Sequence, residues 1–489
     1  MTNTIDRKSD RAPKRNGRQS AVGQHKYKRT PTDIGLALIT PIVGQEFLDR
    51  HNLRDPLNRG LKYGVKQVFS VVGATTRQFK KVSGTKGGPT RLKASGADYF
   101  DLTPDDDQKM IVETVTEFAE EVLRPAARQA DESASYPLDL VTKANELGIT
   151  AINVPEDFDG IAEHRAAVTN SLVAEALAYG DMGLALPILA PAGVASALTH
   201  WGSADQQATY LKEFAGENVP QACVAIAEPR PLFDPTALKT TAVRTPSGYR
   251  LDGVKSLVVA AADAELFIVA AQLNGKPALF IVESSSKGLT VTPDPSMGIR
   301  AAALGRVELN NVTVPLSARL GEDAATDEDY SEAVALSRLG WASLAVGTAH
   351  AVLDHVVPYI KERHAFGEPI AHRQSVAFMC ANIAIELDGL RLITWRGAAR
   401  ADQGLSFARE AALAKKLGTD KGMQIGLDGV QLLGGHGYTK EHPVERWYRD
   451  LRAIGRSISA APPCAFSITA LSLRGSSRLI AMKGLPFPR

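Results

Sequence analysis

The chain changes its pattern of hydrophobic and polar positions twice along its length. After Thr103, apolar residues recur every three or four positions in a segment rich in Glu and Ala. This spacing predicts an amphipathic helix that has Thr103 as its N-cap. The apolar positions of this helix are Met110, Ile111, Val115, Phe118, Ala119 and Val122. The same periodicity predicts that helices continue through Leu198.

Between Gln221 and Pro315 the pattern changes to short runs of β-branched and aromatic residues, which predict strands. Turn signals such as Asn274-Gly275 separate these runs. The predicted strands are 224–227, 249–251, 257–261, 266–271, 279–282, 289–291 and 312–314. After Asp327 the helical periodicity returns for the remainder of the chain. The pattern therefore predicts a compact β domain between two helical regions.

The stretch from Ser83 to Pro89 is rich in glycine and is typical of a linker. The main body begins near Tyr99. We therefore expect five parts along the chain. They are a disordered basic tail at 1–30, an N-terminal extension with its linker at 31–98, an N-terminal helical domain at 99–218, a middle β domain at 219–322 and a C-terminal helical domain at 323–489.

Positive charge is concentrated at the N-terminus. The formal net charge of +2 and the charged fraction of 22% do not indicate a nucleic-acid partner. The first thirty residues nevertheless carry nine Lys and Arg residues against Asp6 and Asp10, with few apolar residues, so we expect a disordered tail. As far as Lys81, basic residues alternate with apolar ones. Two interpretations stay open for this extension: a solvated helix face, or a surface that contacts a membrane or a partner.

Cysteine usage and hydropathy suggest a cytoplasmic protein. Cys223, Cys380 and Cys464 lie far apart in the sequence, which predicts neither a disulfide framework nor a metal site. The apolar run from Ile34 to Val43 is far shorter than the roughly 20 residues of a membrane-spanning helix, and it lacks a clear cleavage site. We expect a cytoplasmic location, with peripheral membrane contact through the extension as the open alternative.

Two strings in the C-terminal third resemble the acyl-CoA dehydrogenase family. The first is Arg363-His364-Ala365-Phe366-Gly367, followed by Gln374. The second is Gln431-Leu432-Leu433-Gly434-Gly435-His436-Gly437-Tyr438, followed by Pro443-Val444-Glu445-Arg446 and Tyr448-Arg449-Asp450. The similarity runs from about Phe100 to about Arg474 and includes the pair Glu228-Pro229. The N-terminal extension falls outside it.

The resemblance carries expectations for fold and chemistry. It implies an α+β multidomain fold with an N-terminal helical domain, a middle β-barrel or β-sandwich domain and a C-terminal four-helix bundle. It also implies FAD as cofactor, an acyl-CoA thioester as substrate and an electron-transfer flavoprotein as the electron acceptor. In the resembled family the flavin ring and the substrate lie in one subunit, while the neighbouring subunit holds the adenosine and pyrophosphate end of the flavin.

The resemblance assigns six residues to the part that holds the neighbour's flavin. They are Arg363, Phe366, Gln374, Gln431, Gly434 and Gly435. These residue types suit a dinucleotide, because an arginine forms charge-assisted bonds to a pyrophosphate and glycines let backbone amides approach the ligand closely. Taken alone, the glycines are more simply explained as a turn between helices. Several matching strings in the right order favour the cofactor site.

The residue that would act as the catalytic base is missing. In the resembled family, a glutamate removes the proton alpha to the thioester carbonyl while a hydride leaves for the flavin. The resemblance places this base at Ile458 or, as in some relatives, at Ser337, directly before Arg338. Neither side chain is a carboxylate. Arg338 is a candidate for the substrate site, with a structural role as the equal alternative.

The middle domain lacks the groups that hold a flavin ring in the resembled family. A threonine, a tryptophan and a second threonine are expected there, and the matching positions hold Ala227, Leu257 and Val259. A small glycine-rich loop is replaced by a segment that includes Phe233, which we expect to fill substrate space. The sequence thus resembles a family member that has lost the ring half of its site and kept the part that serves a neighbour.

These patterns lead to one favoured hypothesis and two alternatives. The favoured one is a subunit of an FAD-dependent acyl-CoA dehydrogenase that lends its flavin-holding residues to a related catalytic subunit. The first alternative is an active homo-oligomeric enzyme with another base; here Glu445 and Asp450 are expected to pair with Arg446, Arg449 or backbone amides. The second is a non-enzymatic scaffold associated with a membrane. The sequence does not define the acyl chain or distinguish a dimer from a tetramer.

Overall fold

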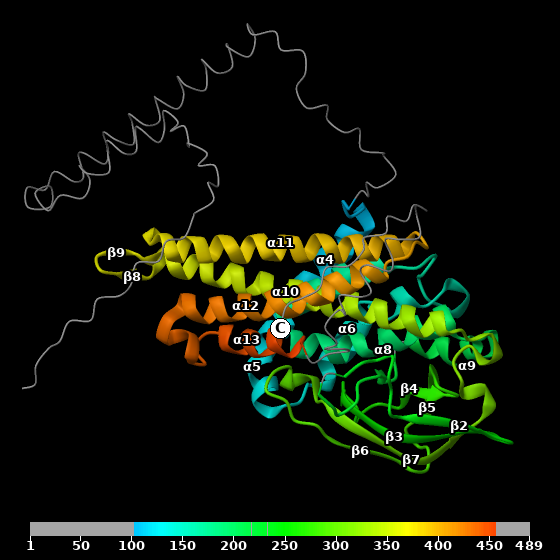
Figure 1. The fold of residues 1–489 in the computed structure, drawn as a ribbon. Coiled ribbons are helices and arrows are strands. Elements are labelled where there is room, and N and C mark those ends of the chain that lie inside the picture. Colours follow the sequence, from blue (N-terminus) through cyan, green and yellow to red (C-terminus); the bar gives the residue numbers. More distant parts are fainter. Residues whose placement is uncertain (1–101, 217, 232, 456–489) are drawn as a thin grey trace, which may run out of the picture. The chain divides into compact units, whose positions relative to one another are not determined.

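The computed structural model describes residues 102–216, 218–231 and 233–455. The chain divides into two units, Met1–Asp98 and Tyr99–Arg489, and every described residue belongs to the second. The predicted basic tail, extension and linker therefore lie outside the described residues, as does Ile458. Within the second unit, helices precede and follow a β domain, as the hydrophobic pattern predicts (Figure 1).

The N-terminal part of this unit is helical. Its helices are α4 (Asp106–Phe118), α5 (Arg124–Ser133), α6 (Leu138–Glu146), α7 (Ala167–Gly180), α8 (Met182–Trp201) and α9 (Ala204–Ala215), with a π-helical turn at Ala119–Leu123. The predicted N-cap Thr103 is wrong. Asp105 caps α4, because its carboxylate accepts a hydrogen bond from the Gln108 N–H at 2.7 Å. In return, the Gln108 side-chain oxygen accepts one from the Asp105 N–H at 3.1 Å.

Helix α8 is the core helix of this part. It is long and apolar enough to span a membrane by length and composition, but 72% of its most apolar window is buried inside the protein. The carboxylate of Asp181 caps its first turn by accepting the Leu184 N–H at 3.0 Å. The same carboxylate pairs with Arg446 at 2.9 Å, so the N-terminal helices are tied to the last described helix by a buried ion pair.

The middle part is one seven-stranded sheet. Its strands are β1 (Ala222–Ala225), β2 (Thr241–Thr245), β3 (Gly248–Val258), β4 (Leu266–Leu273), β5 (Lys276–Glu283), β6 (Leu289–Pro293) and β7 (Gly305–Val314). The order is β1-β4-β2-β3-β7-β6, and β5 pairs with β4. Strands β1 and β2 run parallel to β4, and the remaining pairs are antiparallel.

Two strand predictions are wrong in their bounds. The run 257–261 is not a strand of its own, because β3 continues to Val258 and the chain then turns, with Ala260 at positive φ. Leu257, inside the end of β3, also has positive φ. Irregular pairing between β3 and β7 interrupts the alternation that marks a strand in the sequence. Strand β7 begins at Gly305, seven residues before its predicted start, for the same reason.

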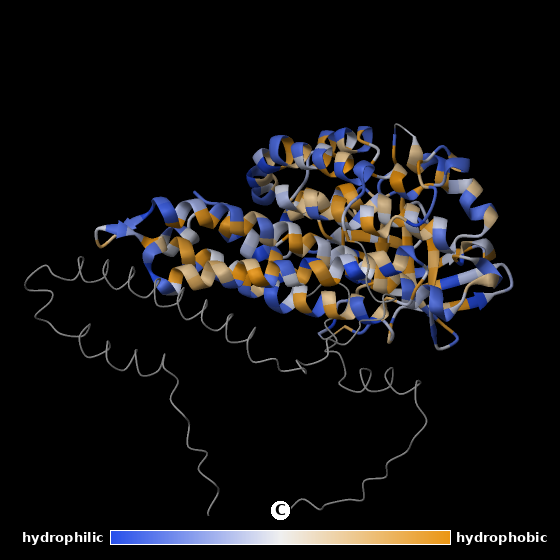
Figure 2. Cartoon of the chain, turned by 90° about the horizontal axis from the view of Figure 1, so that it is seen from above, coloured by the Kyte–Doolittle hydropathy of each residue, from blue (hydrophilic) through white to orange (hydrophobic). Residues whose placement is uncertain are grey.

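The C-terminal part is a helical bundle. Its long helices are α10 (Asp327–Glu362), α11 (Gln374–Asp402) and α12 (Ala408–Leu433), followed by α13 (Val444–Ala453). A two-stranded hairpin, β8 (His364–Ala365) with β9 (Glu368–Pro369), connects α10 to α11. Apolar residues gather along the packed helices and strands, whereas the hairpin end of the bundle is mainly hydrophilic (Figure 2).

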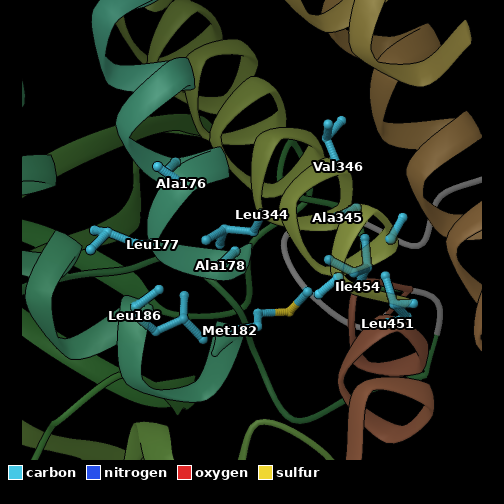
Figure 3. Packing of buried hydrophobic residues seen from close by; sticks show 14 of the residues in the cluster. Ala176, Leu177, Ala178, Met182, Leu186, Leu344, Ala345, Val346, Leu451 and Ile454 are labelled. Carbon is cyan, nitrogen blue, oxygen red and sulfur yellow. The ribbon is translucent and has the colours of Figure 1, made fainter. Parts of the chain in front are cut away.

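The largest hydrophobic core joins the two helical parts. Leu177 and Met182 pack near Leu344 of α10, and Leu451 and Ile454 at the end of α13 belong to the same cluster (Figure 3). Trp447 of α13 is buried in it as well. Since each fully buried large side chain stabilises the fold by roughly 1.5–3 kcal/mol, this contact fixes α13 against α8 and α10.

Candidate functional site

A cavity of about 1090 Å³ lies where the helical parts and the sheet meet. Helices α7 and α8, the ends of β1 and β3, helix α10 and the end of α13 all contribute residues to its lining. Most of the lining is apolar, and the volume is at the upper end of the range for small-molecule and cofactor sites. Its position at a junction of three domains is typical of ligand sites.

The positions that the sequence analysis marked as lost lie in this cavity. Ala227, Leu257 and Val259 all line it, so none of them offers the hydroxyl or indole group expected at its place. Ser337 of α10 lines it too. The alternative base position, Ile458, lies outside the described residues, three positions beyond Gly455 of the lining. At the described positions where the resembled chemistry needs polar groups, the cavity thus offers three apolar side chains and the hydroxyl of Ser337, but no carboxylate.

One carboxylate faces the cavity among its described lining residues, and the sequence analysis missed it. Asp294 accepts the Ser256 hydroxyl at 2.5 Å and the Leu257 N–H at 3.0 Å, and Arg306 lies 3.6 Å away. One oxygen of this carboxylate therefore accepts two hydrogen bonds from the protein, and the other lies nearest to the Arg306 guanidinium. No sequence signal identified Asp294, because its partners approach from β3 and β7.

His200 is a second cavity residue that the sequence analysis missed. Burial, with a smaller contribution from Arg165, lowers the pKa of His200 to about 4. The imidazole is therefore neutral at neutral pH. Because its conjugate acid gives up a proton so readily, it is a weak base for an unactivated carbon acid.

The prediction for Phe233 is wrong, and Arg338 stands apart from the cavity lining. Phe233 does not fill the cavity; it is buried in the core with 5% exposure, and Arg230 covers its ring at 5.2 Å. Arg230 and Pro231 face the cavity in its place. Arg338 is not a lining residue, although Ser337 beside it is. Burial lowers the pKa of Arg338, and the nearby charges of Asp234 and Tyr330 oppose this shift, so it belongs to a network behind the cavity wall.

The Glu228-Pro229 motif has a structural role in this fold. The Glu228 carboxylate accepts the N–H groups of Lys239 and Thr240 at 2.8 to 3.0 Å, and the fully buried Lys255 ammonium lies 3.1 Å from it. Burial opposes ionisation of Glu228, but Lys255 and the two backbone donors outweigh it and lower its pKa. Burial lowers the pKa of Lys255 to about 8, an effect that Glu228 partly offsets.

Two acidic residues of the C-terminal motif also form an ion pair or a hydrogen bond within the fold. The Glu445 carboxylate pairs with Arg449 at 2.9 Å. Asp450 accepts the Ile299 N–H at 2.5 Å, and burial together with the nearby Asp181 raises its pKa. Neither carboxylate is one of the residues that line the cavity, which favours the structural role expected for them.

The residues assigned to the neighbour's flavin lie elsewhere, at one end of the bundle. Arg363 follows α10, Phe366 is at the tip of the β8–β9 hairpin, and Gln374 begins α11 (Figure 1). Arg363 and Gln374 are exposed, and Phe366 is 97% exposed with a φ of 54°. Within the described part of the chain, the Arg363 guanidinium and the Gln374 amide have no hydrogen-bonding partner.

The glycine turn connects α12 to α13. Gly434 ends α12 with a φ of 60°, and Gly435 follows in a short 3-10 turn, Gly434–Tyr438. A Cβ placed on either glycine meets no heavy atom of the described chain within 4 Å, so the backbone is open to a ligand. Gln431 is exposed on the preceding turn. The Tyr359 hydroxyl donates to the Leu433 carbonyl at 3.3 Å and so joins the ends of α10 and α12.

The structure therefore separates the predicted residues into two groups. The six flavin-holding residues are exposed and lie at one end of the bundle, in the segment that joins α10 to α11 and around the turn that closes α12. The lost positions line an internal cavity.

Comparison with known proteins establishes the family. The N-terminal, middle and C-terminal domains of acyl-CoA dehydrogenase match residues 105–218, 223–312 and 329–455. The chain belongs to the acyl-CoA dehydrogenase family. It is 31% identical over 356 residues to the mitochondrial short-chain specific acyl-CoA dehydrogenase of Rattus norvegicus, covering 70% of this chain and 84% of that protein.

Two further relatives agree with this assignment. A probable acyl-CoA dehydrogenase of Bacillus subtilis is 31% identical over 369 residues, covering 74% of this chain and 96% of that protein. The structure of butyryl-CoA dehydrogenase from Megasphaera elsdenii superposes with a TM-score of 0.71 at 26% identity, covering 77% of this chain and all of that one. The predicted three-part fold of helical, β and helical domains is confirmed.

Proposed function

We propose that this acyl-CoA dehydrogenase homologue is a subunit of a heteromeric enzyme and supplies the adenosine-and-pyrophosphate half of a flavin site to a related catalytic subunit. The partner would hold the flavin ring, the acyl-CoA thioester and the base. FAD, when bound there, supplies the acceptor for the hydride. Electrons would then pass to an electron-transfer flavoprotein, the acceptor typical of the family.

The observation that carries this proposal is the contrast between the two halves of the site. At this end of the bundle, Arg363 is exposed and has no ion-pair partner among the described residues, and the Gly435 backbone is open, which fits a pyrophosphate. Inside the chain, Ala227, Leu257 and Val259 offer a flavin ring no polar side-chain group. Each subunit of a homo-oligomeric dehydrogenase needs both halves of the flavin site. A supporting subunit of a heteromer needs only the half that holds the adenosine and pyrophosphate.

The apolar surface of α11 supports a partner of similar shape. Phe378, Ile385 and Leu392 follow one another at intervals of seven residues and are 63%, 67% and 55% exposed. Three large apolar side chains on one exposed helix face favour burial against another helix. This face adjoins Gln374 at the start of the same helix, so a subunit docked there reaches the flavin-holding end.

The alternative of an active homo-oligomer requires a base that the described cavity does not offer. Asp294 is held in place by hydrogen bonds from Ser256 and Leu257 and by the charge of Arg306, and burial lowers the pKa of His200. The alternative of a non-enzymatic, membrane-associated scaffold does not explain why this chain has the Gly434-Gly435 turn that would bind a cofactor. A cytoplasmic location and any membrane contact of the extension remain predictions, because residues 1–98 lie outside the described chain.

The test compares the full chain alone with the chain co-purified with each related dehydrogenase of the same cells. Acyl-CoA-dependent dye reduction is measured for both preparations, with acyl chains of several lengths. The proposal predicts no turnover by the chain alone and turnover by one pair. A variant of the pair carrying Asp294→Asn in this chain keeps that activity. Turnover by the purified chain alone, abolished by Asp294→Asn, would show that this chain has its own base.

A further inference from the structure

A cluster of imidazole and carboxylate groups lies in the loop between α12 and α13, outside the cavity. His436, Glu441 and His442 each offer one ligand atom, and these three atoms lie within 4.8 Å of one another. The His436 Nδ1 atom is 3.1 Å from a Glu441 carboxylate oxygen. The spacing of these three residues along the sequence is not typical of a metal site. The fold is needed to show that their side chains lie close together.

The fold holds one side of this cluster in place. The His442 Nδ1 atom lies 3.1 Å from the Nε2 atom of His355 on α10, and the Tyr359 ring packs edge-on against the His442 ring at 5.5 Å. The His355 ring in turn packs against the buried Trp447 at 5.7 Å. His442 is therefore oriented by two residues of α10, whereas the side chains of His436 and Glu441 remain 46% and 68% exposed.

The donor set selects a class of ion. Two imidazoles and one carboxylate suit zinc and similar transition metals, whereas magnesium and calcium prefer oxygen ligands. Ligands of one tetrahedral zinc ion lie about 3.3 Å apart, given metal–ligand bonds of about 2.0–2.2 Å. The His436 and Glu441 ligand atoms already lie 3.1 Å apart, and both side chains are exposed and so have room to adjust towards His442. A ring whose second nitrogen bonds to another residue, as His442 bonds to His355, is the usual arrangement of a histidine ligand.

We propose that His436, Glu441 and His442 form a binding site for a divalent transition-metal ion such as Zn²⁺. The three side chains are the ligands, and His355 positions His442. A bound ion would cross-link the loop that carries Gly434 and Gly435, because His436 lies at its start and His442 near its end. This site is independent of the proposed flavin role and requires no partner subunit.

The test measures Zn²⁺ binding by the full chain without an affinity tag, after treatment with a chelator. Competition with a chromophoric zinc chelator gives the dissociation constant, and Co²⁺ absorption in the visible region reports the ligand set. The wild-type chain is expected to bind one ion per chain. Glu441→Gln and His442→Phe are each expected to weaken binding by at least about tenfold. Glu441 is exposed, so its replacement leaves the packing intact.

A matched control is available in the same helical bundle. His372 and Glu368 form an exposed histidine–carboxylate pair at 3.2 Å, like that of His436 and Glu441, but without a second histidine. His372→Ala is expected to leave zinc binding unchanged. The proposal is overturned if the wild-type chain binds zinc no more tightly than His442→Phe does, or if His372→Ala weakens binding as much as Glu441→Gln.

Discussion

The hydroxyl of Tyr359 and the carbonyl of Leu433 lie 3.3 Å apart and join the end of α10 to the turn that closes α12. This contact connects the two segments that carry the predicted flavin-holding residues. Tyr359→Phe keeps the ring packing and removes one hydrogen bond, worth about 1 kcal/mol. We expect flavin to dissociate from the active pair about fivefold more readily, as measured by equilibrium dialysis. An unchanged flavin affinity would mean that the two segments do not act together.

Replacing Arg363 tests the charge at this end of the bundle. Arg363→Gln removes the exposed guanidinium that we assign to the pyrophosphate, and a charge-assisted bond of this kind is worth about 1.5–3 kcal/mol. We expect flavin affinity of the pair to fall by roughly tenfold or more. Arg244 on β2 is exposed as well but lies in the β domain, so Arg244→Gln serves as the control. Equal losses in both variants would indicate a general electrostatic effect.

Gly435→Val separates flavin binding from folding. A Cβ at Gly435 meets no described atom within 4 Å, so we expect the melting temperature of the chain alone to stay within about 2 °C of the wild type. The added side chain would occupy the space where a pyrophosphate approaches the backbone, so the pair should lose bound flavin. A variant that melts at the wild-type temperature and yet retains full flavin argues against a role of this turn in binding.

The buried pair of Glu228 and Lys255 gives a stability prediction. Lys255→Met leaves the Glu228 carboxylate buried with its ammonium partner removed, which costs about 3–5 kcal/mol of unfolding free energy. Lys276→Met, on the exposed pair with Asp327 at 2.6 Å, should cost less than about 1 kcal/mol. Urea unfolding of both variants checks this difference. If both variants lost less than about 1 kcal/mol of unfolding free energy, the methionine side chain would replace the buried ammonium of Lys255 without a large loss of stability.

His200 predicts a pH dependence of stability. Its pKa in the folded chain is about 4, below the roughly 6.5 of an unfolded histidine, so the unfolded chain binds the extra proton between these values. The contribution of His200 to the free energy of unfolding is fully present above the unfolded pKa of about 6.5, and it is lost as the pH falls towards 4. Between pH 7 and pH 5 the loss is about 2 kcal/mol. His200→Gln should remove that part of the pH dependence in urea unfolding, and an unchanged profile would contradict the assignment.

The sequence predicted the order of domains and the family motifs because those features are local. Helical spacing, turn residues and short motifs depend on neighbours along the chain. Contacts between distant segments were missed for the opposite reason. Asp294 obtains its partners from β3 and β7, and His442 meets His355 from a helix 87 residues earlier. The N-cap of α4 is Asp105 and not the predicted Thr103, because the backbone geometry that decides where a helix begins is not visible in the spacing of apolar residues.

The central claim concerns where the flavin is held, and flavin stoichiometry of the purified pair tests it most directly. Native mass spectrometry counts flavin and chains in the same particle. We expect a colourless chain when this protein is purified alone. We expect about one FAD for every two chains in the active pair, because this chain supplies only the adenosine-and-pyrophosphate half and each pair therefore has one complete flavin site. A chain that carries one FAD per copy when purified alone would contradict the claim.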